Sequence, residues 1–218
     1  MQINGHTLNT VLVVDDDPDA RGTYQYAIED LKLTPVFEEG PLPDVDAALR
    51  SLSQKADSLI CDYHLRKRNY SAFNGDLFVA RSYQARVPGL LCTSYSDFEI
   101  TLMRTTRRFI PNLVKSDEFG PESIIKAFTR CILENDGQFD PSRKPWRTLV
   151  RIEEIPMEVD YCYVVVPAWR TDEKIRLLSK DIPNDLRAQL VEGARFHAQV
   201  NLGVARTEEL YFTGWEAQ

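Results

Sequence analysis

Short, wholly apolar runs alternate with longer amphipathic segments over about the first 135 residues. The run at 11–14 is Val-Leu-Val-Val, a β-branched block typical of a strand buried on both faces. Similar runs predict four further strands, at 34–37, 58–62, 90–93 and 112–114. Segments between and after them predict five helices, at 18–31, 44–55, 75–85, 98–106 and 122–133. This alternation predicts a five-stranded parallel sheet covered by helices on both faces.

The pattern changes after residue 136. Residues 137–148 are mostly polar and contain Gly137, Pro141 and Pro145, which predicts a linker. Beyond the linker, strands are expected at 160–166, 174–178, 195–202 and 210–213, with one short helix near 183–190. In the third of these strands four polar residues alternate with apolar ones, which indicates one wet face: Arg195, His197, Gln199 and Asn201. Residues 149–218 are therefore predicted to form a small, mainly antiparallel β domain.

Composition narrows the class of protein. Charged residues make up 27% and hydrophobic residues 43% of 218, as in ordinary globular proteins. No run approaches the roughly 20 apolar residues that cross a bilayer, and the first residues lack the layout of a secretory signal. We therefore expect a cytoplasmic protein that does not associate with membranes. The net charge of −7 gives no electrostatic reason to expect a nucleic-acid partner.

The four cysteines lie about 30 residues apart, each in an apolar run and without a CxxC pair. This spacing argues against a zinc site and against a disulfide framework. Buried free thiols are the expected state of Cys61, Cys92, Cys131 and Cys162.

Polar residues follow the predicted parallel strands where each strand ends. Asp15 and Asp16 follow the first strand, Asp62 ends the third, Thr93 the fourth, and Lys115 follows the fifth. Parallel strands bring their carboxyl ends to one edge of the sheet, where ligands bind in such folds. Three carboxylates gathered there would repel one another unless a cation joined them. Mg²⁺, which prefers oxygen ligands and keeps several waters, is the ion expected.

This set of residues resembles the receiver domain family of two-component response regulators. The resemblance covers residues 1–136 and implies a flavodoxin-like, doubly wound sheet. It implies that Asp62 accepts a phosphoryl group, with Thr93 and Lys115 contacting the phosphoryl oxygens. It also implies a Mg²⁺ site formed by Asp15, Asp16, Asp62 and the backbone carbonyl of His64. Apart from its own phosphorylation and dephosphorylation, no enzymatic activity is expected.

Three features depart from the family pattern. Ser116 stands where receivers usually have proline after the lysine, and Asn112 stands where an aromatic residue commonly reports the switch. The loop at 63–74 is longer than usual and carries the basic run Arg66-Lys67-Arg68, which attracts an acidic partner or is simply solvated. The departures leave the phosphorylation chemistry possible and put an aromatic-coupled switch in doubt.

Two functions follow from the sequence. In the first, a sensor histidine kinase or phosphotransfer protein phosphorylates the chain, and the β domain binds a downstream protein partner. In the second, the receiver fold is a phosphorylation-independent scaffold for docking or dimerisation, including a possible homodimer. The aromatic residues Trp169, Tyr211 and Trp215 either form a contact surface of the β domain or pack in its core.

Overall fold

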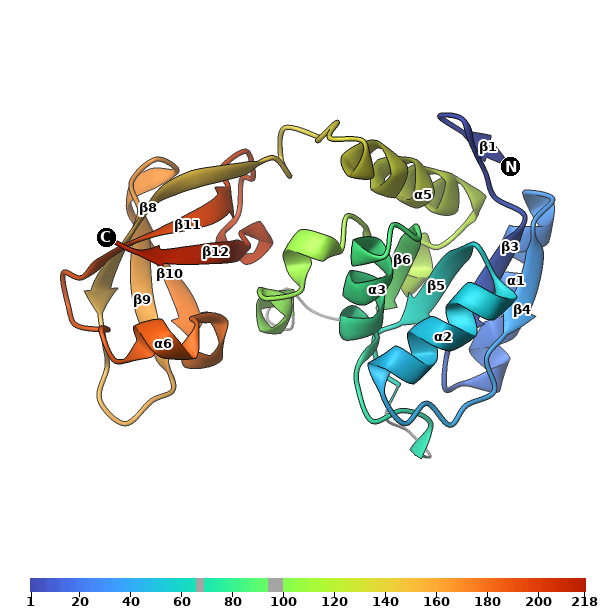
Figure 1. The fold of residues 1–218 in the computed structure, drawn as a ribbon, viewed down its shortest axis with the longest axis horizontal. Helices are drawn as coiled ribbons and strands as arrows, with labels where there is room; N and C mark the ends of the chain where they lie inside the picture. The colour runs from blue at the N-terminus through green and yellow to red at the C-terminus, as the bar shows by residue number, and fades with distance from the viewer. Residues whose placement is uncertain (66–68, 94–99) are drawn as a thin grey trace. The chain divides into compact units, whose positions relative to one another are not determined.

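The structure, a computed structural model, describes residues 1–65, 69–93 and 100–218 (Figure 1). The chain divides into two compact units, which we call the parallel-sheet unit and the antiparallel unit. The parallel-sheet unit contains Met1–Ser96 and Phe109–Phe139, and the antiparallel unit contains Asp97–Arg108 and Asp140–Gln218. None of the helices in the described ranges is both long enough and apolar enough to span a membrane.

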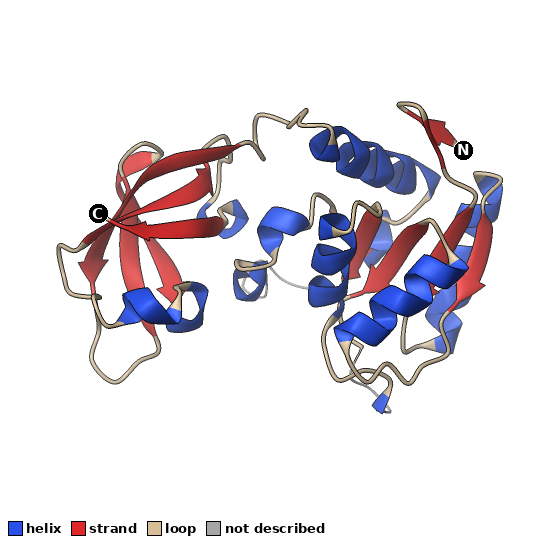
Figure 2. Cartoon of the chain, in the orientation of Figure 1, coloured by secondary structure: helices blue, strands red, loops and turns tan. Residues whose placement is uncertain are grey.

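The first unit is built on five parallel strands in the order β4-β3-β5-β6-β7 (Figure 2). The strands are β3 (Thr10–Val14), β4 (Thr34–Phe37), β5 (Ser58–Asp62), β6 (Gly89–Thr93) and β7 (Leu113–Lys115). The helices are α1 (Pro18–Asp30), α2 (Val45–Lys55), α3 (Gly75–Gln84) and α5 (Pro121–Asn135). In this order the first strand lies between the second and the third, which is the flavodoxin-like arrangement predicted.

Helix starts follow the expected chemistry. Asp17 is the N-cap of α1, and its side chain accepts a hydrogen bond from the Asp19 N–H at 3.0 Å, with Pro18 in the first turn. Asp44 caps α2 in the same way through the Ala47 N–H at 2.7 Å. The helices predicted at 18–31 and 44–55 begin at these positions to within one residue.

The core of this unit consists of buried apolar side chains. The four residues of the run at 11–14 have no exposed surface, and α1 and α5 supply Ile28 and Phe128, also fully buried, to the cluster against the sheet. A hairpin of β1 (Gln2–Ile3) and β2 (His6–Thr7) precedes the sheet. Strands of two residues are too short to show a pattern of alternating polar and apolar residues, so the sequence analysis did not predict this hairpin.

The predicted helix at 98–106 falls partly outside the described residues. Its remainder forms a short 3-10 helix at Thr101–Met103, and a second follows at Arg107–Phe109. Residues up to Arg108 group with the antiparallel unit rather than with the parallel sheet that alternation predicts they would cover. In the described part of the segment, Met103 is buried, and Arg104 donates hydrogen bonds to the carbonyls of Thr207 and Leu210 in the antiparallel unit.

The second unit is a five-stranded antiparallel sheet in the order β10-β9-β8-β11-β12. Its strands are β8 (Pro145–Glu154), β9 (Tyr161–Val166), β10 (Arg170–Leu178), β11 (Arg195–Asn201) and β12 (Phe212–Ala217), with the short helix α6 (Asn184–Arg187). The sheet has its own buried cluster, which includes Val150, Val164, Ile175 and Ala198. The sequence analysis missed β8, whose first four residues lie in the predicted linker, because Pro145 and four charged residues obscured its alternation.

The side chain of Asn201 is not where the sequence placed it, and the structure decides between the two positions that the sequence left open for Tyr211. Asn201, expected on the wet face, is only 2% exposed, since its side chain amide bonds three backbone groups. Tyr211 is fully buried and donates its hydroxyl to the Arg143 carbonyl at 2.5 Å, so it belongs to the interior and not to a contact surface. Trp169 and Trp215 are partly buried and pack against the apolar cluster of this unit.

The prediction of buried free thiols is confirmed. All four cysteines are free and buried.

Candidate site at the carboxyl edge of the parallel sheet

Three carboxylates meet where β3 and β5 end. The strands are hydrogen-bonded neighbours, with Val14 opposite Cys61, so Asp15 and Asp16 emerge beside Asp62. One oxygen from each carboxylate lies within 4.8 Å of the others. Asp15 and Asp16 are 3% and 6% exposed, and Asp62 is partly buried. The predicted convergence of these acids is present in the structure.

Burial opposes the ionisation of the Asp62 and Asp15 carboxyl groups at this edge of the sheet. Burial raises the pKa of Asp62 to about 7, the negative charge of Asp15 adds to the rise, and the His64 N–H opposes it. Burial also raises the pKa of Asp15 above its usual value, against hydrogen bonds from Asp17 and Tyr24 that lower it. The site therefore favours the approach of a cation that neutralises the carboxylates.

Backbone contacts fix where the carboxylates point. The Asp17 N–H donates to Asp15 Oδ1 at 2.7 Å, and the His64 N–H donates to Asp62 Oδ2 at 2.8 Å. Arg21, on the first turns of α1, donates Nε and Nη2 to the Asp15 carbonyl at 3.1 and 2.9 Å. Its Nη1 forms an ion pair with Glu39 at 2.7 Å. Arg21 thus holds the turn after β3 in place, a role that the sequence analysis missed.

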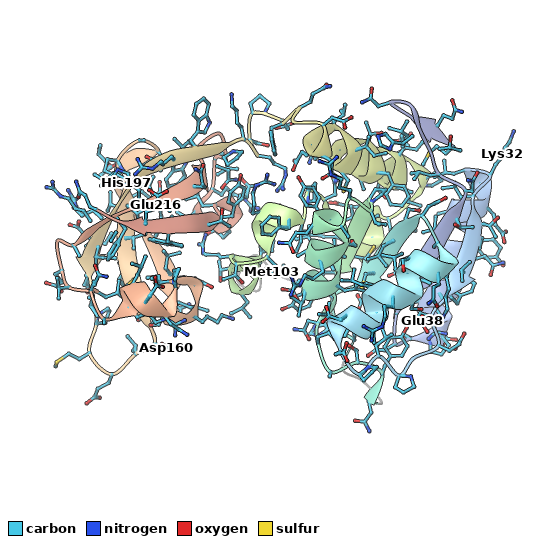
Figure 3. All side chains as sticks on the ribbon, in the orientation of Figure 1. Lys32, Glu38, Met103, Asp160, His197 and Glu216 are labelled. Atoms are coloured by element: carbon cyan, nitrogen blue, oxygen red, sulfur yellow. The ribbon has the colours of Figure 1, made fainter. Side chains whose placement is uncertain are left out.

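A second brace lies beyond β4. Glu38, labelled in Figure 3, is 8% exposed and accepts hydrogen bonds from Ser51 at 2.5 Å and Lys55 at 2.8 Å on α2. Burial works against ionisation of Glu38, but the bonds from Lys55 and Ser51 outweigh it and hold its pKa below the usual value. Its backbone carbonyl accepts the Tyr70 hydroxyl at 2.6 Å. The loop at 69–74 is thereby tied to the end of β4.

Helix α3 begins against the end of β5. The Gly75 N–H donates to the Tyr63 carbonyl at 2.9 Å. A Cβ at Gly75 would lie 1.9 Å from the Asp62 carbonyl oxygen and 2.8 Å from Cys61 Sγ. Only glycine fits at this position, so the close approach of α3 helps to set the backbone of Asp62.

A hollow of about 310 Å³ opens beside the carboxylates. Its acidic side is formed by the aspartates, and its other side includes Ala20, Tyr24, Ser116 and Phe119. The Tyr24 and Phe119 rings meet edge to face with centroids 4.8 Å apart. The sequence analysis missed both aromatic residues, although Tyr24 lies four residues before Ile28, on the buried side of α1.

Thr93 and Lys115 are register partners at the ends of β6 and β7. Thr93 is 1% exposed, whereas Lys115 is exposed. Within 1–65, 69–93 and 100–218, Lys115 forms no ion pair with a carboxylate. Both residues thus end strands at the expected edge, and their contact with a phosphoryl group stays a prediction.

The departures from the family pattern also have a place in the structure. Asn112 is 6% exposed and donates its Nδ2 to the Ala127 carbonyl at 3.0 Å, which ties the start of β7 to α5. Ser116 lines the hollow beside the aspartates. The basic run Arg66-Lys67-Arg68 lies outside the described residues.

The donor set fits a hard divalent ion. All three converging side chains offer carboxylate oxygens, and neither a thiol nor an imidazole is among the converging groups of the described residues. Mg²⁺ binds such oxygens and retains water, so the residues present suit it better than a softer metal.

Comparison with known proteins gives a likeness in structure only. No family model and no curated protein matches the sequence. The parallel-sheet unit has the flavodoxin-like strand order β4-β3-β5-β6-β7. The signal receiver domain of an HD domain-containing protein from Pseudomonas fluorescens Pf-5 is 18% identical, with a TM-score of 0.45 over 62% of this chain and 97% of that one. The Vibrio cholerae chemotaxis response regulator CheY4 is 21% identical, with a TM-score of 0.41 over 57% and 99% of the two chains. A putative response regulator from Chloroflexus aurantiacus is 17% identical, with a TM-score of 0.44 over 58% and 98%.

Proposed function

We propose that the protein is a response regulator of a phosphorelay, in which Asp62 accepts a phosphoryl group and the antiparallel unit passes the signal to a protein partner. The observation that carries the proposal is the convergence of Asp15, Asp16 and Asp62 within 4.8 Å at the carboxyl edge of a parallel sheet. The family resemblance favours a sensor histidine kinase or a phosphotransfer protein as the donor.

The chemistry assigned to Asp62 is a nucleophilic displacement at phosphorus. An Asp62 carboxylate oxygen forms a bond to the phosphorus of the donor, and the bond from phosphorus to the donor atom breaks with its electron pair. With acetyl phosphate the products are an aspartyl phosphate and acetate. The His64 N–H, 2.8 Å from Asp62 Oδ2, orients the carboxylate for this attack.

Asp15, Asp16, Asp62 and the His64 carbonyl would hold Mg²⁺ in this proposal. When bound, the ion neutralises charge on the carboxylates and on the phosphoryl oxygens. The Thr93 hydroxyl and the Lys115 ammonium are assigned to the other phosphoryl oxygens, where hydrogen bonds to a charged group are strongest. Lys115 is exposed and without a carboxylate partner in the described ranges, so it is available for that contact.

Incubation with acetyl phosphate and Mg²⁺, followed by intact mass spectrometry, tests the proposal. We expect a gain of one phosphoryl group in the natural protein and none in Asp62→Asn. Asp44→Asn is the matched control, because it removes one carboxylate, keeps a good N-cap on α2 and lies outside the carboxylate cluster. No gain in the natural protein would favour the phosphorylation-independent scaffold instead.

A further inference from the structure

The chain between β6 and β7 belongs to the antiparallel unit. It leaves the parallel-sheet unit after Ser96, three residues beyond Thr93, and rejoins it at Phe109. We call its described residues 100–108 the strap. Because Thr93 ends β6 at the edge where the carboxylates gather, the strap is covalently close to the proposed phosphorylation site.

One arginine anchors the strap. Arg104 is 3% exposed, and its Nη1 donates to the Leu210 carbonyl at 2.7 Å and to the Thr207 carbonyl at 2.9 Å. Its guanidinium carbon lies 6.0 Å from the centroid of the Phe212 ring. Burial lowers the pKa of Arg104 to about 10, so the side chain stays charged at neutral pH. Burying a cation costs free energy unless its hydrogen bonds are kept. A displacement of Arg104 that breaks these two bonds is therefore unfavourable.

The end of the strap is held separately. Arg143, 5% exposed, donates Nη2 to the Arg108 carbonyl at 2.7 Å and Nη1 to the Arg107 carbonyl at 3.4 Å. The guanidinium carbons of Arg108 and Arg143 each lie 5.9 Å from the centroid of the buried Tyr211 ring. Met103, which directly precedes Arg104 in the chain and is labelled in Figure 3, is 1% exposed.

The surface that receives the strap is itself braced. Asn201 at the end of β11 donates Nδ2 to the Ser142 and Glu209 carbonyls at 3.0 and 3.1 Å, and its Oδ1 accepts the Tyr211 N–H at 2.8 Å. The segment 207–212 is therefore held by Asn201 as well as by Arg104.

We propose that the surface formed by Thr207, Leu210, Tyr211 and Phe212 is a docking site for the strap, and that the docked strap carries the phosphorylation signal into the antiparallel unit. The inference rests on the proposed function for the origin of the signal. The docking itself rests only on the contacts of Arg104 and Arg143. A change in the conformation of Thr93 would then reach the antiparallel unit along the chain. This route does not need the aromatic residue that receivers commonly have where this chain has Asn112.

Hydrogen exchange read by mass spectrometry tests the docking first, without a phosphodonor. Arg104→Met keeps the length of the side chain and removes both donors, so we expect about tenfold faster exchange in 101–108 and 207–212. Arg195→Met, at an exposed arginine on β11, removes the same charge and is expected to exchange like the natural protein. Unchanged exchange in Arg104→Met would overturn the docking site. If that variant does not fold, Arg104→Lys decides, because it keeps the charge but lacks the Nη1 group that donates both hydrogen bonds, and an exchange equal to that of the natural protein would count against the anchor.

The second step adds acetyl phosphate and Mg²⁺ and records the mass and the exchange together. We expect all folded variants to gain the phosphoryl group. The exchange of 207–212 should respond in the natural protein and in Arg195→Met, but not in Arg104→Met. A phosphorylated natural protein with unchanged exchange there, or an equal response in Arg104→Met, would overturn the signalling route and leave the proposed function standing. Absence of the mass gain would overturn both the proposed function and the route, while the first step still decides the docking.

Discussion

At Asp62, burial opposes the negative charge that the proposed phosphoryl transfer requires. The chain surrounds it with apolar strand residues and two further acids, which oppose its charge, and supplies the His64 N–H, which favours the charge. The folded state therefore retains a proton on this carboxyl to higher pH than the unfolded chain does.

The pKa of Asp62 predicts the sign of a pH effect in metal-free buffer. The value is about 7 in the folded state and about 4 for an unperturbed aspartate. Between those values the folded state binds more protons than the unfolded state, so the free energy of unfolding should fall as pH rises from about 4 to about 7. Asp62→Asn should remove this fall and be more stable at pH 8 by about 1 to 3 kcal/mol, a range that allows for partial exposure. Urea unfolding at several pH values in the presence of a chelator measures it.

Asp30→Asn is the control for that measurement, because Asp30 is exposed at the end of α1 and outside the carboxylate cluster. Its stability should follow that of the natural protein at each pH. A natural protein whose stability rises between pH 4 and 7 as much as that of Asp62→Asn would contradict the raised pKa.

Gly75 supplies a second test at the residue scale. Gly75→Ala would force a Cβ into the space of the Asp62 carbonyl, so it should destabilise the protein by at least about 2 kcal/mol and lower its phosphoryl uptake. Gly22→Ala in α1 meets nothing within 4 Å and should instead stabilise by about 0.5 to 1 kcal/mol. Thermal unfolding of the two variants compares them, and a Gly75→Ala protein as stable as the natural one would mean that α3 can shift away from β5.

The acidic cluster was predictable at this scale, but its supports were not. Three acids that end adjacent parallel strands must share an edge, so the sequence located Asp15, Asp16 and Asp62. The roles of Arg21 and Phe119 depend on the direction of a side chain across two loops, which no periodicity encodes. The same holds for Asn112, whose hydrogen bond to α5 needs the folded arrangement of both elements.

Among the elements, long patterns were predicted well and short or charged ones poorly. The five parallel strands and the helices α1, α2, α3 and α5 carry unbroken apolar periodicity, and their limits differ from the predicted ones by a few residues. Strand β8 was missed because it begins with Pro145 inside the predicted linker and its charged residues obscure its alternation. The segment at 101–108 was assigned to the wrong sheet, since the hydrogen bonds of Arg104 and Arg143 that hold it join residues far apart in the chain and leave no periodic pattern.

Strand β11 gives a prediction at this scale. Asn201→Ala would leave two part-buried carbonyls and one buried N–H without their partners, and we expect a loss of about 1 to 3 kcal/mol. Gln199→Ala, two residues earlier on the same strand and partly exposed, should change the stability by less than about 0.5 kcal/mol. Tryptophan fluorescence during urea unfolding compares the two, and equal midpoints would show that Asn201 does not brace the end of β11.

At the scale of the whole molecule, each of the two units contains a cluster of buried apolar residues within the described ranges. One gathers around the parallel sheet and includes Ile28, and the other lies in the antiparallel unit and includes Ile175. All three tryptophans, Trp146, Trp169 and Trp215, belong to the antiparallel unit. In the described part of the chain, every α-helix of ten or more residues belongs to the parallel-sheet unit. Fluorescence and far-ultraviolet circular dichroism therefore report on different units.

This division predicts two distinguishable unfolding transitions. Ile28→Ala removes a fully buried side chain from the first cluster and should cost that unit about 2 to 5 kcal/mol, which shifts the circular dichroism midpoint more than the fluorescence midpoint. Ile175→Ala, also fully buried, should shift the fluorescence midpoint more. Both probes are followed in one urea titration of each variant. Equal shifts in both probes for both variants would mean that the units unfold together, and the strap, which links one cluster to the other along the chain, would then be the first place to look for the coupling. Unequal shifts of the two midpoints would show that each unit unfolds separately. A signal between the units would then depend on particular contacts such as those of Arg104.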